Sequence, residues 1–259
     1  MERKHKFPNY KYKPCEQNYL KIFSLKYLII LLCLISIKSF INHRNQIIFI
    51  SENNQISLKV KGNGNIKIFN PLSQIKPSSY YLNRDPVPKQ INNDATIELH
   101  NSDNFIKLIF SNAVTSCNSL FKGCSNIIEI DLINFDSSNV QNINSMFQGC
   151  TSLKKIKFGN FQTSRITSIS NSFYGCSSLE TLDLSSFDTS NVNHYHFIFQ
   201  GCSSLVYVDL SNFDTTRNPC GANLFYNGCA KLEFVNFKQV KLSTAHAKQY
   251  ENSFHINWQ

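Results

Sequence analysis

Cysteines recur at a fixed interval from residue 124 onward in this 259-residue chain. Cys124, Cys150, Cys176 and Cys202 are each 26 residues apart, and Cys229 follows one residue late. Thiols aligned in this way could form disulfides or bind a metal ion, because adjacent strands lie about 4.8 Å apart, a separation that a disulfide allows. Cysteine is also among the residues most often buried completely. We expect four buried free thiols, with disulfides within the column and metal binding as alternatives.

Two further groups could carry chemistry. Cys220 and Cys229 lie where the interval becomes irregular, which makes them the better candidates for a disulfide. His194 and His196 lie close to Cys202 in the sequence and could form a metal site or a Cys-His pair. Residues two apart on a short helix do not share a face, so we favour polar surface side chains. We expect no cofactor and no metal.

Charged residues also recur with the interval. One column alternates in sign over its first three positions and comprises Asp131, Lys157, Asp183 and Asp209. Glu129 is expected to face Lys155 in the same way. Hydrolysis by paired carboxylates needs two acids together in one cleft, whereas acids spaced along a ladder form cross-strand pairs. Without a nucleophile-base pair or a metal set, the sequence predicts no enzyme.

Phenylalanines mark five units of the same length, at Phe121, Phe147, Phe173, Phe199 and Phe225. In each unit a short strand is expected first, because Leu179, Leu182 and Leu184 follow an L-x-x-L-x-L pattern. The polar run 188–191 could then cap a helix.

The rest of the unit suggests a short helix. Val140, Ile143, Met146 and Phe147 have helical spacing, and Gly149 is placed to end such a helix. One such coil cannot bury its own apolar side, so we expect successive coils to stack, with strands near Leu153, Leu179 and Leu205 in one parallel sheet.

Three strings closely resemble the BspA-like leucine-rich-repeat surface proteins: residues 146–153, 173–192 and 199–205. The resemblance covers about residues 105–240 and implies an α/β repeat, a leucine-rich-repeat solenoid with 26-residue coils of one short parallel strand and one short helix. It also implies display on a cell surface for attachment, and it carries no catalytic residues. Lys157 departs from the usual Asp, and residues 217–220 depart from the usual Asn-Val.

The remaining segments are expected to cap the repeats. Residues 47–70 alternate around a turn at Gly62 and Gly64, which predicts a β-hairpin cap before the solenoid. Four prolines within 71–90 predict a loop, and 97–110 is again strand-like. We therefore divide the chain into a β-rich cap with a proline-containing loop over 41–104, the solenoid over 105–240 and a C-terminal cap over 241–259.

The N-terminus predicts attachment to a membrane. Residues 1–26 hold seven Lys or Arg against two Glu, a net charge of +5, and residues 27–38 form a hydrophobic signal-anchor or signal peptide. Positive residues remain on the cytoplasmic side, so 1–26 are expected in the cytoplasm and 41–259 outside the cell. A cleaved signal and a secreted protein is the alternative.

Residues 118–240 hold eight Lys or Arg against nine Asp or Glu, so no nucleic-acid partner is expected. We expect the coils to bind a protein or cell-surface ligand. An intracellular, membrane-attached scaffolding repeat protein is the alternative from a different class.

The expected contact surface lies on the later strands. Strand alternation places Leu205, Val208 and Leu210 inside, and the residues on or beside the outer face include Val206, Tyr207, Asp209 and Phe234. Tyr207 is expected beside Phe234, and exposed aromatic residues are common anchors of interfaces. Alternatively, the C-terminal segment with Phe254, Ile256 and Trp258 covers Phe234 as a cap.

Overall fold

A computed structural model describes residues 54–214, 228–236 and 255–257. The basic tail, the apolar segment 27–38, Cys220 and most of the predicted C-terminal cap lie outside these residues. Among the residues described, no helix is long and apolar enough to cross a membrane.

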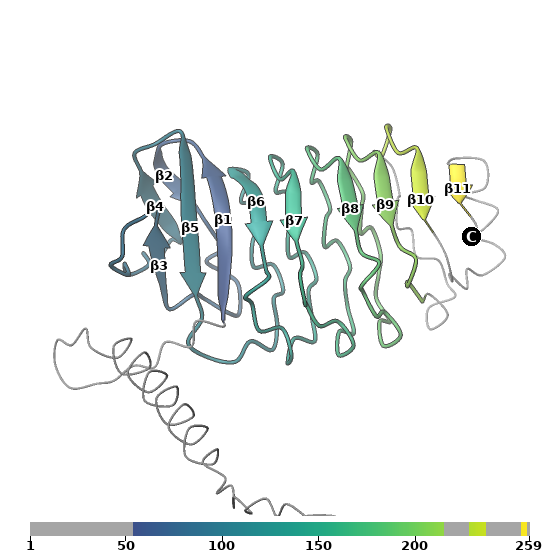
Figure 1. Ribbon diagram of the computed structural model, residues 1–259, viewed down its shortest axis with the longest axis horizontal. Coiled ribbons are helices and arrows are strands. Elements are labelled where there is room, and N and C mark those ends of the chain that lie inside the picture. Colours follow the sequence, from purple (N-terminus) through teal and green to yellow (C-terminus); the bar gives the residue numbers. More distant parts are fainter. Residues whose placement is uncertain (1–53, 215–227, 237–254, 258–259) are drawn as a thin grey trace, which may run out of the picture. The chain divides into compact units, whose positions relative to one another are not determined.

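Short strands follow one another along a stack of coils, and each coil runs from one strand to the next (Figure 1). The strands are β6 (Ile127–Asp131), β7 (Lys155–Lys157), β8 (Thr181–Asp183), β9 (Tyr207–Asp209) and β10 (Phe234–Asn236), and β11 (His255–Asn257) comes after them. β6 pairs with β7, and β8 to β11 pair in sequence, all of them parallel. The repeat interval of the sequence is thus the chain length from one strand to the next strand of the stack.

In the coils that the structure describes, the predicted helices do not form, so the α/β fold class is wrong. The described residues contain strands, bridges and turns, and no helix. In 145–149, alternate amides donate to carbonyls of the following coil: Ser145 to Ser170, Phe147 to Ser172 and Gly149 to Tyr174, at 2.9, 2.9 and 2.7 Å. An α-helix needs these amides for bonds to residues four positions earlier. Ser145 and Gly149 also have φ of 53° and 73°, which a right-handed helix excludes.

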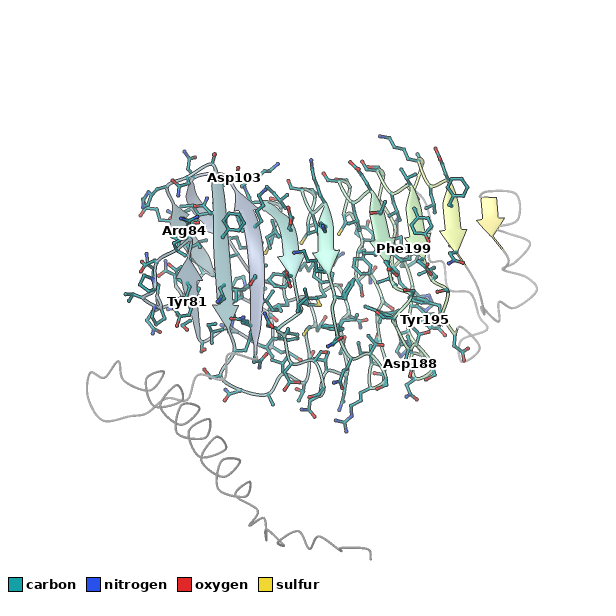
Figure 2. The ribbon with its side chains drawn as sticks, in the orientation of Figure 1. Tyr81, Arg84, Asp103, Asp188, Tyr195 and Phe199 are labelled. Atoms are coloured by element: carbon teal, nitrogen blue, oxygen red, sulfur yellow. The ribbon has the colours of Figure 1, made fainter. Side chains whose placement is uncertain are left out.

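The core consists of columns of like residues from successive coils. Phe121, Phe147, Phe173 and Phe199 stack with ring centroids 6.0, 5.4 and 5.7 Å apart, and all four rings are buried. Tyr195 and Phe199 lie inside the last of these coils (Figure 2). The apolar spacing that predicted a helix therefore marks positions that point into this core.

Five strands precede the coils: β1 (Gln55–Lys61), β2 (Gly64–Lys67), β3 (Ser79–Leu82), β4 (Thr96–Leu99) and β5 (Asp103–Ile109). A five-stranded sheet has the order β3-β5-β1-β6-β7, and β1 runs antiparallel to both β5 and β6. The first coil therefore has a hydrogen-bonded neighbour on the side that faces no other coil.

The predicted β-hairpin is also wrong. β1 and β2 follow each other across the Gly62 turn but belong to different sheets, because β5 and β6 occupy both edges of β1. β2 pairs instead with β4. The predicted loop 71–90 contains β3, which pairs with β5.

The coil strands do not form one parallel sheet as predicted, since β7 and β8 belong to different sheets. Asp131 and Asp183 each accept a hydrogen bond from the amide two residues later, at 3.0 and 2.9 Å, and Lys157 offers no such acceptor. Phe158 also takes the place that Leu132 and Leu184 occupy in neighbouring coils. The centroid of its ring lies 4.8 Å from that of the Phe187 ring. The larger side chain and the different turn account for the break.

Candidate functional site

The cysteine column is a structural element of the core. Cys124, Cys150, Cys176 and Cys202 are buried and free, as predicted. The thiols of Cys150, Cys176 and Cys202 donate to the carbonyl oxygens of Phe121, Phe147 and Phe173 in the preceding coil, at 3.1, 3.2 and 3.0 Å. Each of these three thiols therefore links two successive coils.

Burial keeps these thiols neutral. It raises the pKa of Cys124 to about 12 and that of the less buried Cys229 to about 11. The pKa values of Cys150 and Cys176 are raised well above their usual range, first by burial and then by the neighbouring thiols. Because the thiolate is the nucleophile and the metal ligand, these groups are unsuited to cysteine chemistry near neutral pH.

The other candidates for cysteine and metal chemistry do not come together. Cys229 donates its thiol to the carbonyl of Phe199 at 2.9 Å, and its predicted partner Cys220 lies outside the described residues. His194 is exposed, while Cys202 is buried inside the coil. No group of three or more metal-ligating side chains occurs in the part of the chain that the structure describes.

Several accessible charged residues line the outward face of the five-stranded sheet. Asp131 and Lys157 form an ion pair at 3.2 Å, and Glu129 lies opposite Lys155 in the parallel register, as predicted. Glu129 also lies 4.0 Å from Lys59 of β1. Such exposed pairs contribute at most about 1 kcal/mol each, so they mainly fix how the face presents its charges.

The predicted contact residues lie on β9 and β10. The parallel register places Tyr207 opposite Phe234, and Phe234 is 46% exposed. The hydroxyl of Tyr207 donates to Oδ2 of Asp209 at 3.1 Å, and the side-chain amide of Asn236 donates to the same oxygen at 2.9 Å. Burial, followed by the contact with Asp209, raises the pKa of Tyr207.

Backbone bonds fix the same strands from both sides. Val206 is half-buried, and its carbonyl accepts the amides of Glu233 and Phe234 at 3.0 and 3.1 Å. On the far side, the backbone of β11 pairs with β10 and places His255 opposite Phe234. The predicted cap residues Phe254 and Trp258 lie outside the described residues, so the choice between contact site and cap stays a prediction.

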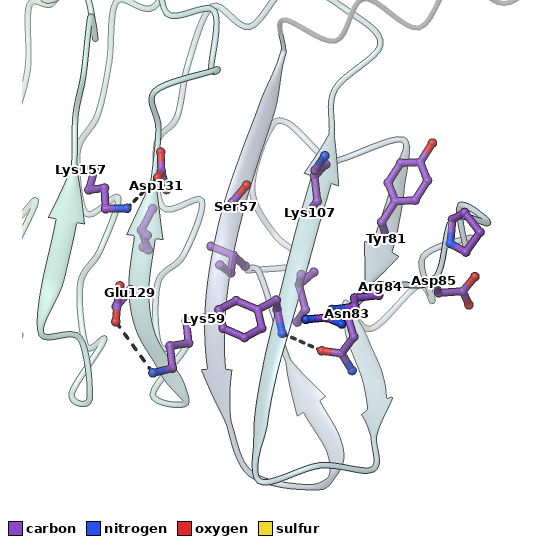
Figure 3. Close-up of a pocket in the computed structure, with 15 residues that line it drawn as sticks. Ser57, Lys59, Tyr81, Asn83, Arg84, Asp85, Lys107, Glu129, Asp131 and Lys157 are labelled. Atoms are coloured by element: carbon purple, nitrogen blue, oxygen red, sulfur yellow. Dashed lines mark hydrogen bonds and ion pairs between the residues drawn. The ribbon is translucent and has the colours of Figure 1, made fainter. Parts of the chain in front are cut away.

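Sequence reasoning missed a groove on the outward face of the five-stranded sheet (Figure 3). Its volume is about 490 Å³, and its lining comes from β1, β3, β5, β6, β7 and the turn after β3. Phe105 is 60% exposed in this lining. The signal in the sequence was an aromatic residue at an outward position of a strand that otherwise alternates polar and apolar.

Comparisons with known proteins agree with the repeat. Residues 65–163 match the family described as the BspA type leucine-rich repeat region, in six copies, and residues 115–237 match a family described as Mycoplasma protein of unknown function, DUF285. No curated protein and no solved structure matches the chain. The resemblance to BspA-like leucine-rich-repeat proteins is confirmed. The protein carries BspA-type leucine-rich repeats, and neither family description names an enzymatic activity.

We predict that alkaline pH destabilises the stack through its thiols. A cysteine whose pKa rises on folding contributes stability that is complete below its unfolded pKa, near 9.0, and is lost as the pH rises toward the folded value. Each column thiol ionises in the unfolded chain but not in the folded one, so it should lower the free energy of unfolding by up to about 1.4 kcal/mol per pH unit above 9. The melting temperature, measured from pH 7 to 10.5, should therefore fall less steeply in Cys176→Ala than in the unaltered chain. Equal slopes would contradict this role of the column.

Proposed function

We propose that this repeat protein is displayed at the cell surface, where the outward face of its later coils binds a protein or cell-surface ligand. Tyr207 and Phe234 form the centre of the contact, with Val206 and Asp209 beside them. The single observation that carries this proposal is a 46% exposed phenylalanine in register with a tyrosine on an otherwise polar strand face. Stacking of the coils does not require an aromatic residue at either outward position.

The geometry around Tyr207 favours binding. Its hydroxyl is held by Asp209, and Asp209 is held in turn by Asn236 and by the amide of Ser211. A side chain that is fixed before the partner arrives loses less conformational entropy on binding. Aromatic residues are also the most frequent anchors of protein interfaces, because they bury a large area with few rotatable bonds.

The proposal includes attachment to the membrane and adhesion through the repeat surface. The net charge of +5 on residues 1–26 and the apolar segment 27–38 support an uncleaved anchor with residues 41–259 outside the cell. The match to the BspA-type repeat supports a repeat protein that interacts through its surface.

The contact is tested by Tyr207→Ser and Phe234→Ser. We expect each change to weaken binding of the labelled, detergent-solubilised chain to intact cells and to a coated extracellular-matrix preparation by at least about tenfold, because buried aromatic anchors dominate interfaces. Leu72→Ser is the matched control, since Leu72 is an 89% exposed apolar side chain on the cap. A lower melting temperature with unchanged binding per folded molecule would assign the aromatic pair to a terminal cap.

Topology is tested separately on intact cells. Added protease should digest residues 41–259 and leave 1–26 protected, and carbonate washing should leave the chain in the membrane fraction. Release of a shortened chain into the medium would show a cleaved signal. Complete protection from protease would place the repeats inside the cell and favour scaffolding.

A further inference from the structure

The groove on the five-stranded sheet is built from two outward rows of side chains. In one row, the register brings Tyr81 opposite Lys107 and then Ser57 opposite both Lys107 and Asp131. In the other, Phe105 lies opposite Lys59, two residues along β5 from Lys107. The groove therefore presents an exposed apolar ring and an ammonium group on the same strand face.

The charges of the groove are unequally matched. Lys59 and Lys157 lie within 4.0 Å of Glu129 and Asp131, respectively. Within the described ranges, neither Arg84 nor Lys107 has a carboxylate within that distance. The ammonium of Lys107 lies 6.0 Å from the centroid of the Tyr81 ring, and Arg84 is exposed. Two cations on the lining are thus available to an acidic ligand.

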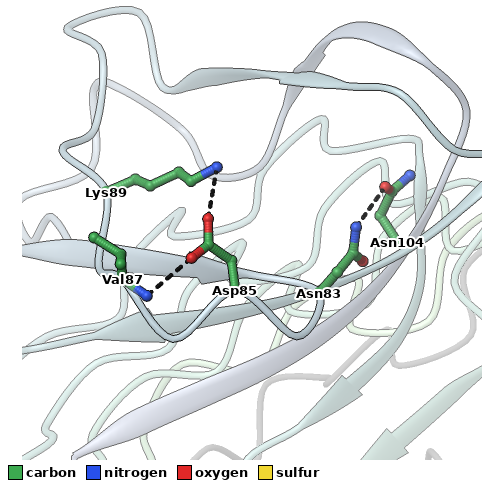
Figure 4. A network of polar contacts seen from close by, with 5 residues as sticks. All are labelled: Asn83, Asp85, Val87, Lys89 and Asn104. Atoms are coloured by element: carbon green, nitrogen blue, oxygen red, sulfur yellow. Dashed lines mark hydrogen bonds and ion pairs between the residues drawn. The ribbon is translucent and has the colours of Figure 1, made fainter.

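Hydrogen bonds hold the turn that carries Arg84 on both sides, at Asp85 (Figure 4) and at Asn83. Asp85 accepts the amide of Val87 at 3.0 Å and forms an ion pair with Lys89 at 3.2 Å. Asn83 exchanges hydrogen bonds with the backbone of Phe105: its amide donates to the Phe105 carbonyl, and its side-chain oxygen accepts the Phe105 amide. Asp85 is therefore occupied within the turn and leaves Arg84 free to bind.

We propose that this groove binds an extended segment of a partner protein that presents an acidic side chain two residues from an apolar one. The apolar side chain packs on Phe105 and the carboxylate pairs with Lys107, while Arg84 adds positive charge from the turn at the Phe105 end of the groove. Residues two apart in an extended chain point to the same side and lie about 7 Å apart, which is the spacing of Phe105 and Lys107 along β5. The segment and the strand below it therefore have matching periods.

Recognition at this site is by side chains. Both edges of β5 are occupied, by β3 and β1, so the segment lies on the outward face of the sheet along β5 and adds no strand. A carboxylate alone would use the two cations but not the exposed ring, and an apolar segment alone would leave the cations unmatched. The site is separate from Tyr207 and Phe234, which belong to the four-stranded sheet.

Fluorescence anisotropy with a labelled synthetic peptide, serine-phenylalanine-serine-aspartate-serine, tests the proposal on the full chain in detergent. Lys107→Gln, Arg84→Gln and Phe105→Ser should each weaken binding by about tenfold or more. A peptide with asparagine in place of aspartate should lose a similar factor, and so should one with serine in place of phenylalanine.

Two variants serve as controls. Lys155→Gln removes an exposed cation from the same sheet outside the groove and should change the affinity by less than about twofold, because solvent and salt screen distant surface charges. Phe234→Ser should also leave peptide binding unchanged, so this site can fail or succeed independently of the proposed contact surface. The melting temperature of each variant verifies that it folds. Arg84→Gln changes an exposed turn residue, so of the three variants it should disturb the core least.

Three outcomes would overturn the proposal. Equal losses in Lys155→Gln and Lys107→Gln would show attraction by general charge. Displacement of the peptide by N-acetylaspartate at concentrations near the peptide's own Kd would show a simple anion site. Unchanged affinity in Phe105→Ser would remove the apolar half of the recognition.

Discussion

Hydrogen bonds between successive coils are the interaction on which this structure depends. Alternate amides of the turn segments donate to the coil that follows, as Phe121 does to Met146 and Phe147 to Ser172. Each of these bonds joins an amide to a carbonyl 25 residues ahead. An insertion or deletion within a coil would separate these amides from their carbonyl acceptors, so the bonds hold the coil length constant. The connection persists between the coils of β7 and β8, where the sheet is interrupted but Gly149 still donates to Tyr174.

This constraint separates inward from outward positions. Inward positions repeat because each side chain packs on its equivalent in the next coil, which produces the columns of phenylalanine rings and thiols. Outward positions also face their equivalents in the next coil, as Asp131 faces Lys157, but these solvent-exposed neighbours accept side chains of different kinds, so the positions vary. The residues of both proposed binding sites, such as Phe105, Lys107 and Phe234, lie at outward positions.

The sequence allowed correct prediction of the features that repeat, including the buried thiols and the pairing of Tyr207 with Phe234. The helices were predicted wrongly because buried residues three or four apart also occur in a tightly turning coil. What distinguishes the two is the partner of each amide, and for Phe147 that partner lies in another coil. The pairing of β1 and the groove were missed for a related reason, since both depend on strands brought together from distant parts of the chain.

Hydrogen exchange of backbone amides tests the account most directly, because it reports the bonding of each amide whatever the secondary structure. The account predicts that the amides of Ser145, Phe147 and Gly149 exchange as slowly as those of β1, although they lie in turns. Exchange of these three amides at the rate of exposed turns, with β1 still protected, would show that bonds between coils do not hold the stack together.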